Sequence, residues 1–550
     1  MFESIKLKFS ETGELSLPTK GITIFVGANN SGKSLVLREI EAAFATHPFP
    51  AGLKILMDYE VVWPTSENLD ARIAKAKSLQ QPGLPLGHIV LGRHSPGGGL
   101  EAQQVPEAQL RSIADSKADK HWITTQYLRW GVIRLDGRSR FVLTNDQKGG
   151  DLLGPPQNVL AHLFLDTEAR KSVRALIKDA FNLYLVIDPT NLGQLRIRLS
   201  QEPPLDDEQS LNPQAREYHG RALHIKDASD GVQAFTGIVT AVRSGEFHTI
   251  LVDEPEAFLH PPLARKLGRN LAALTTERGA ALLASTHSSD FLMGCIQAST
   301  SVRVVRLEYS GGKSRARMID PDVLATLLKR PLMRSANVIS GLFHDGVVVL
   351  ESDNDRAFYS EIYHRITEAV SGYPSILFIN AQNKQTIRDI IGPLRQFGVP
   401  AAAIPDIDFL KDGGKTWTDW LRAAQVPEAL HVGYGQQRAA IHDAIKATGR
   451  DMKTEGGLDL LDRGNREAAD QFVRNLRDYG IFPVPRGELE SWLPELGIPG
   501  KKTDWTVSIL ERLGSDPSSP DYTKPAEEDV WLFMRDIASW IGNSARKGTA

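Results

Sequence analysis

Apolar residues along this 550-residue chain fall into short continuous runs and longer amphipathic stretches that alternate. Residues 1–26 read as strands and end in the run Gly21–Val26, which has the character of a buried strand. Residues 35–44 then repeat apolar positions with a helical period. Two further apolar runs, at 249–252 and 280–285, are also predicted to be strands. Together these patterns predict an α/β fold.

The segments between these runs have weaker patterns. Trp130–Thr144 alternates like a β-hairpin with its turn at Asp136-Gly137. Val159–Asn182 has a helical period, and strands are predicted at Leu183–Asp188 and Gln194–Leu199.

A second α/β pattern follows a helical connector over residues 320–343. Its predicted strands are 347–350, 375–380 and 401–404, and its helices are 356–370 and 385–397. A C-terminal helix carries one apolar stripe, which we expect to pack on the second domain. The sequence therefore predicts a larger domain over 1–340 and a smaller one over 345–550.

Composition narrows the choice of partners and location only slightly. The formal net charge of −3 gives no overall attraction to nucleic acid, so any such binding needs a local basic patch. A single cysteine, Cys295, excludes an internal disulfide. No run is long enough to span a bilayer, so we expect a cytoplasmic protein that does not contact a membrane.

Residues 27–34 read GANNSGKS and fit the phosphate-binding loop G-x-x-x-x-G-K-[ST]. The loop lies between a predicted strand and a predicted helix, an arrangement that presents backbone N–H groups to an anion. We expect Lys33 to contact the β- and γ-phosphates of ATP and Ser34 to ligate Mg²⁺. The predicted nucleotide-binding residues of this loop are Gly27, Asn29, Asn30, Ser31, Gly32, Lys33 and Ser34.

Asp253 and Glu254 follow the apolar strand at 249–252, at the edge where α/β sheets bind ligands. Asp253 is placed to hold Mg²⁺, and Glu254 to polarise the attacking water. Acidic capping of the next helix is the alternative interpretation. His287 follows the strand at 280–285, a position that resembles the switch histidine of ABC ATPases, and the resemblance implies that it reaches the γ-phosphate.

The strings GANNSGKS, ASDGVQ, ILVDEPEAFLHP and STHSSDF, in this order, resemble an ABC-class ATPase of the RecF/SMC-like kind. The resemblance implies that two such domains clamp ATP, so the active state would be a homodimer or a higher oligomer. A loop of one copy would then face the phosphate-binding loop of the other; its nucleotide-binding residues would be Ser229, Gly231 and Gln233. A transporter head is the competing family member.

In the second half, Glu351 and Asp355 follow one predicted strand, and Asp406 and Asp408 follow another. Oxygen-only clusters of this kind suit Mg²⁺ or Mn²⁺. The alternative is that Asp353 and Asp355 cap a helix and that Asp406 and Asp408 cap a loop.

This second half resembles a Toprim domain, and the chain as a whole resembles OLD-family nucleases. The resemblance implies that Glu351, Asp355, Asp406, Asp408 and Glu490 hold metal, with Glu351, Asp406 and Asp408 acting in catalysis. Ser352 and Pro405 depart from the family pattern. The late lysine of relatives has three candidates here: Lys501, Lys502 and Lys524.

The resemblance implies ATP-regulated, metal-dependent cleavage of DNA, plausible in anti-phage defence. Two alternatives fit the same sequence. One is an ATPase sensor or scaffold whose degenerate Toprim-like domain holds a partner effector. The other is a RecF-like repair ATPase, which leaves the second domain without a role.

Overall fold

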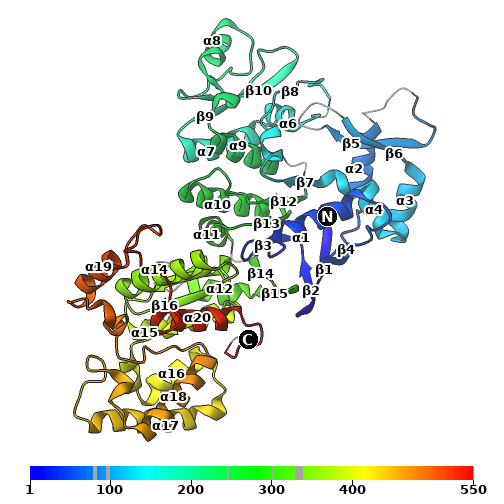
Figure 1. Ribbon diagram of the computed structural model, residues 1–550. Helices are drawn as coiled ribbons and strands as arrows, with labels where there is room; N and C mark the ends of the chain where they lie inside the picture. The colour runs from blue at the N-terminus through cyan, green and yellow to red at the C-terminus, as the bar shows by residue number, and fades with distance from the viewer. Residues whose placement is uncertain are drawn as a thin grey trace. The chain divides into compact units, whose positions relative to one another are not determined.

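The computed structural model (Figure 1) describes residues 1–77, 83–94, 100–154, 156–244, 247–299, 301–328 and 338–548. These residues form two compact units. One consists of Met1–Val26 and Asn30–Ala325, and the other of Thr326–Ala550 with Gly27–Asn29. The expected helical connector is described at its two ends, α12 (Pro321–Leu328) and η3 (Val338–Phe343), and its residues 329–337 lie outside the described ranges.

A six-stranded sheet forms the centre of the first unit, in the order β15-β14-β3-β13-β12-β7. Strands β7, β12, β13, β3 and β14 run parallel, and β15 pairs antiparallel with β14. The register places Ala284 beside both Val252 and Ile24, so the carboxyl ends of the parallel strands meet at one edge. The strands are β3 (Gly21–Val26), β7 (Val132–Leu135), β12 (Thr249–Asp253), β13 (Ala281–Ser285), β14 (Val302–Ser310) and β15 (Lys313–Ile319).

Strands β3, β12 and β13 are continuous apolar runs, and nearly all of their side chains are buried. This burial explains why they lack the alternation of a half-exposed strand. The helices adjoining these strands in the chain are α1 (Lys33–Ala45), α9 (Asp230–Arg243), α10 (Pro261–Arg278) and α11 (Ser289–Ala298).

The N-terminal part of the first unit adds a second sheet, in the order β2-β1-β4. The predicted opening strand pair is confirmed by the antiparallel pairing of β1 with β2. The elements here are β1 (Phe2–Phe9), β2 (Gly13–Pro18), β4 (Leu56–Val61), α2 (Ser66–Lys77), β5 (His88–His94), β6 (Leu100–Pro106), α3 (Glu107–Ser116), α4 (Lys120–Gln126) and η1 (Leu128–Gly131).

The hairpin predicted over Trp130–Thr144 is wrong. Strand β7 pairs parallel with β12, and the short helix α5 (Ser139–Val142) follows it. The Asp136 carboxylate accepts hydrogen bonds from the backbone N–H groups of Arg138 at 3.0 Å and Ser139 at 2.9 Å. Asp136 therefore starts a helical turn instead of a two-residue hairpin turn.

The single helix predicted over Val159–Asn182 is two helices, α6 (Val159–Leu165) and α7 (Thr167–Phe181). Asp166 separates them because its carboxylate accepts the Ala169 N–H at 2.9 Å and caps α7. The remaining elements of this region are β8 (Gln147–Lys148), β9 (Tyr184–Asp188), β10 (Gln194–Ser200), α8 (Pro213–Arg221), β11 (Leu223–His224) and η2 (Ile225–Asp227).

The second unit is built on a three-stranded parallel sheet in the order β17-β16-β18. Its strands are β16 (Gly346–Leu350), β17 (Ile376–Asn380) and β18 (Ala401–Ile404). Its other elements are α14 (Asp353–Ala369), α15 (Lys384–Gln396), η4 (Ile407–Lys411), α16 (Gly414–Ala423), α17 (Glu428–Ala447), η5 (Gly457–Leu460), α18 (Arg463–Asp478), η6 (Leu489–Ser491), η7 (Pro494–Leu496), α19 (Lys502–Leu513) and α20 (Asp529–Gly542).

The apolar stripe of α20 packs in the core of this second unit, as predicted. Met534 and Ile537 are fully buried in the cluster that contains Val348 and Leu350 of β16. Among the helices of the described ranges, none combines the length and apolar character that crossing a bilayer requires.

Gly294 allows α11 to pack closely on α10, and this contact gives a test of the fold. A methyl group added there would overlap the Arg265 carbonyl oxygen of α10. A Gly→Ala change in a helix usually stabilises by about 0.5–1 kcal/mol, but here the overlap should reverse the sign. We expect Gly294→Ala to lower the free energy of unfolding by about 1–3 kcal/mol in denaturant titration.

The matched control is Gly220→Ala in α8, where nothing lies within 4 Å of the added methyl group. Equal stabilities of the two variants would contradict the close packing of α10 and α11.

Candidate functional site: a phosphate-binding loop and a carboxylate cluster

Residues 27–34 connect β3 to α1 through a tight loop. Three of them have positive φ: Gly27 at 143°, Asn30 at 62° and Gly32 at 97°. Gly32 is the N-cap of α1 and provides no side-chain cap. The loop therefore has the local geometry that leaves helix N–H groups directed at an anion.

Asp253 connects this loop to two neighbouring strands. Its Oδ1 atom accepts hydrogen bonds from the hydroxyl of Ser34, at 2.8 Å, and from the hydroxyl of Ser285. Its Oδ2 atom lies 3.6 Å from the guanidinium of Arg134 on β7. A hydroxyl and a carboxylate oxygen in contact are the oxygen ligands that Mg²⁺ prefers, so the pair fits that ion.

Lys33 lies at the start of α1 and is 5% exposed. Its ammonium donates to the Ser31 hydroxyl at 3.4 Å. Burial lowers the pKa of Lys33 to about 8, whereas the nearby carboxylates of Glu254, Asp253 and then Glu256 act to raise it. An anionic phosphate would favour the charged form of this lysine.

Glu254 has a backbone φ of 52°, which is uncommon for a residue other than glycine. Its N–H donates to the Ser285 carbonyl at 2.9 Å, and its carboxylate is half exposed. The Nε2 atom of His287 lies 3.8 Å from the Glu254 carboxylate. Burial, followed by the charge of Lys33, lowers the pKa of His287.

Two charged residues near this site were not predicted from the sequence. The Glu256 carboxylate accepts from the Thr286 hydroxyl at 2.8 Å and from the His287 N–H at 2.7 Å, and burial raises its pKa. Arg140 is fully buried and donates to the carbonyl oxygens of Asp253, at 2.7 Å, and Glu254, at 3.0 Å. Arg140 lies in the segment that was predicted to be a hairpin.

Ser229 is the N-cap of α9, and Gly231 and Gln233 lie in the first turn of this helix. Ser229 is exposed, and its side chain makes no capping bond. Gln233 is buried and donates to the Ala228 carbonyl at 2.9 Å. A methyl group on Gly231 would lie 2.7 Å from the Phe258 carbonyl oxygen. Gln233 therefore holds its own loop, while Ser229 is accessible from outside.

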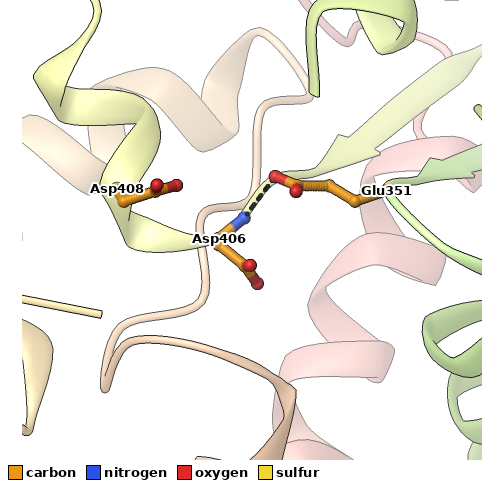
Figure 2. Close-up of side chains that lie close together, drawn as sticks. All are labelled: Glu351, Asp406 and Asp408. Atoms are coloured by element: carbon orange, nitrogen blue, oxygen red, sulfur yellow. Dashed lines mark hydrogen bonds between the residues drawn. The ribbon is translucent and has the colours of Figure 1, made fainter. Parts of the chain in front are cut away.

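In the second unit the structure brings together Glu351, Asp406 and Asp408 (Figure 2). One carboxylate oxygen from each lies within 4.8 Å of the other two. Glu351 follows β16, whereas Asp406 and Asp408 follow β18, its parallel neighbour. The Asp406 N–H donates to Glu351 Oε1 at 3.2 Å, the dashed line in Figure 2.

Burial and mutual repulsion act on this cluster. Burial, followed by the charge of Asp406, raises the pKa of Glu351 to about 7. Burial also raises the pKa of Asp406. The Oδ1 atom of Asp408 is buried and has no hydrogen-bond partner among the described residues. Three hard oxygen donors, one of them without a partner, fit a divalent cation.

Asp355 and Glu490 lie outside this group of three. The Asp355 carboxylate accepts from the N–H and the hydroxyl of Ser352, both at 2.8 Å, in a capping box at the start of α14. Burial raises the pKa of Asp355 to about 6. Glu490 accepts the Lys502 N–H at 2.6 Å. The hydrogen bonds of Asp355 are those of the helix-cap alternative, and metal ligation by either residue stays a prediction.

The lysines that form ion pairs with the cluster, within the described part of the chain, are Lys453 and Lys384. Lys453 Nζ lies 2.6 Å from Asp406 Oδ2, and Lys384 Nζ lies 3.3 Å from Asp408 Oδ2. The three candidates named from the sequence were Lys501, Lys502 and Lys524. Spacing in sequence gave no signal for Lys453, because the loop after α17 carries it to the cluster.

Comparisons with known proteins match one part of the chain to a family model and about half of it to a nuclease. A family model described as "AAA domain, putative AbiEii toxin, Type IV TA system" matches residues 132–294. The "Old nuclease" of Escherichia phage P2 is 23% identical over 312 residues, which cover 53% of this chain and 50% of the relative. The chain therefore spans about half the length of that relative. The resemblance to the OLD family is confirmed.

Solved structures of SMC heads also match. One is an SmcHead bound to the C-winged helix domain of ScpA, at 15% identity and a TM-score of 0.32, covering 60% of this chain and 99% of that one. Another is the SMC head domain from Thermotoga maritima, at 14% identity and a TM-score of 0.28, covering 58% and 99%. The assignment of a P-loop ATPase-type α/β head rests on the six-stranded sheet and on the loop between β3 and α1.

The raised pKa of Glu351 predicts how cation binding depends on pH. A cation needs the ionised carboxylate, so Mn²⁺ affinity should fall about tenfold per pH unit below about 7. Without metal, the folded state holds this proton more tightly than the unfolded state, so stability should fall as pH rises towards 7. Glu351→Gln should remove that loss, which is on the order of 1–3 kcal/mol.

Calorimetric Mn²⁺ titration at pH 6 and pH 8, with denaturant titration of the metal-free protein, measures both effects. Asp353→Asn is the control, since that carboxylate is mostly exposed and lies outside the cluster. Equal Mn²⁺ affinity at the two pH values would contradict a role for Glu351 as a ligand.

Proposed function

We propose that the first unit binds and hydrolyses ATP and thereby regulates a metal-dependent endonuclease site in the second unit. The single observation that carries the nuclease part is the close approach of Glu351, Asp406 and Asp408 from two parallel strands. Similarity to Old nuclease supports the same activity. The proposed substrate is DNA, and the proposed biological role is anti-phage defence.

In the proposed ATPase site, Ser34 and Asp253 hold Mg²⁺, and Lys33 contacts the β- and γ-phosphates. Glu254 polarises the attacking water, and His287 reaches the γ-phosphate. The exposed Ser229 loop would complete the site of a second copy of this chain, so that ATP joins two heads.

In the proposed nuclease site, Glu351, Asp406 and Asp408 hold Mg²⁺ or Mn²⁺, with Asp355 and Glu490 near them. A divalent cation there would polarise the phosphoryl oxygen of the scissile phosphodiester. Lys453, paired with Asp406, would supply positive charge to the same phosphate. Glu351 would be held ionised by the bound cation, so in the loaded site its role is that of a ligand.

A second function is favoured by one observation. The ammonium groups of Lys453 and Lys384 already partly neutralise the aspartates, so the cluster can exist without a cation. The second unit would then hold a partner effector, and the protein would act as an ATP-dependent sensor or scaffold.

The ATPase assignment is tested by Lys33→Ala and Glu254→Gln. Removing the lysine charge should abolish ATP binding, while Glu254→Gln should bind ATP and hydrolyse it at least about 100-fold more slowly, because only the water-polarising carboxylate is lost. ATP binding and turnover assays measure the difference. Light scattering of Glu254→Gln with and without ATP tests the pairing of heads. Wild-type turnover in Lys33→Ala would disprove the assignment.

The nuclease assignment is tested by Asp406→Ala in a plasmid-nicking assay with Mg²⁺ or Mn²⁺, with and without ATP. Loss of a direct ligand should reduce cleavage by at least about 100-fold, because even changes to outer-shell partners cost 10–100-fold. ATP turnover should stay near wild type. If Asp406→Ala still protects cells against phage while Lys33→Ala does not, the sensor function replaces the nuclease.

A further inference from the structure

A pocket of about 440 Å³ in the first unit has no role in the proposed ATPase or nuclease chemistry. Its volume is typical of small-molecule sites. Gly131 and Thr249 line it, and they stand at the N-terminal ends of β7 and β12. The ATPase residues Asp253 and Glu254 stand at the other end of β12, so the pocket opens at the opposite edge of the sheet.

Aromatic side chains form part of the wall. Trp63, from the segment after β4, and Tyr127, after α4, both line the pocket and are partly buried. The Tyr127 hydroxyl donates to the Asn68 carbonyl at 3.5 Å, which leaves the ring as the apolar surface. Two partly exposed aromatic rings in one pocket suit a planar ring system such as a nucleobase.

Arg72 brings a positive charge to the pocket lining. His248 also lines the pocket, and burial lowers its pKa, so at neutral pH the imidazole can donate a hydrogen bond but adds no charge. Arg278, whose charge also acts on His248, donates to the backbone carbonyls of Val242 and Phe247. The positive charge of Arg72 favours an anion beside the aromatic wall.

Thr249 is also part of the pocket lining. It is 2% exposed, and its hydroxyl oxygen is buried without a hydrogen-bond partner among the described residues. Because buried hydroxyls in native proteins are usually paired, the hydrogen bonding around this residue is not fully satisfied within the described part of the chain.

We propose that this pocket is an effector site for a nucleotide, separate from the phosphate-binding loop. The base packs against Trp63 and Tyr127, and the phosphate lies near Arg72 and His248. A free mononucleotide and the 5′-phosphorylated end of a nucleic acid strand share this chemistry. Thr249 begins β12 and Asp253 ends it, so the pocket and the ATPase residues lie at opposite ends of one strand.

The test uses the full chain carrying Lys33→Ala, so that the phosphate-binding loop does not contribute. The probes for calorimetry are AMP, adenosine, and a six-nucleotide single strand with or without a 5′-phosphate. AMP or the phosphorylated strand should bind at one site per chain, and removing the phosphate should weaken binding at least about 10-fold. Binding of AMP identifies a free nucleotide, and binding of the phosphorylated strand alone identifies a strand end.

Trp63→Ala and Arg72→Gln, each added to Lys33→Ala, should weaken that binding at least about 10-fold. Arg216→Gln, on the exposed face of α8, is the matched control and should leave it unchanged. If Trp63→Ala does not fold, Arg72→Gln carries the test. Failure of every probe to bind, or binding that these variants leave unchanged, would overturn the proposal without affecting the ATPase or nuclease assignments.

Discussion

The Asp253 carboxylate is the interaction on which the arrangement of the first unit's site depends. One of its oxygens accepts hydrogen bonds from Ser34 at the start of α1 and from Ser285 at the end of β13. The other lies beside Arg134 of β7. A single partly buried acid thus fixes the helix after the phosphate-binding loop against three parallel strands. Hydrogen bonds to a charged acceptor are stronger than neutral ones, which suits this role.

Buried charge around that carboxylate is matched by opposite charge or by backbone dipoles. Lys33 lies among three carboxylates, and burial still lowers its pKa. Arg140 donates to the backbone carbonyls of Asp253 and Glu254, and this supports the uncommon backbone conformation of Glu254. The cost of burying these charges is therefore offset within the protein.

The second unit concentrates negative charge instead. Glu351, Asp406 and Asp408 repel one another, and two lysines partly compensate them. Strongly perturbed carboxylates in such a group are more typical of a functional site than of a structural one. The orphaned oxygen of Asp408 indicates that the compensation by lysine is incomplete.

The sequence by itself determined the elements that a local pattern specifies. Ala401–Ile404 is a strand with the predicted bounds, and residues 27–34 adopt the tight loop that their glycines allow. It also placed Glu351 and Asp406 at strand ends, because a continuous apolar run followed by an acid is readable along the chain.

Only the tertiary structure decided which strands became neighbours: β7 pairs with β12 instead of folding back on itself, and this pairing brings Arg134 and Arg140 to Asp253. In the same way, long-range packing and not spacing in sequence placed Lys453 beside Asp406. A local period reports how a segment folds, whereas contacts between distant segments depend on registers and packing that no local period encodes.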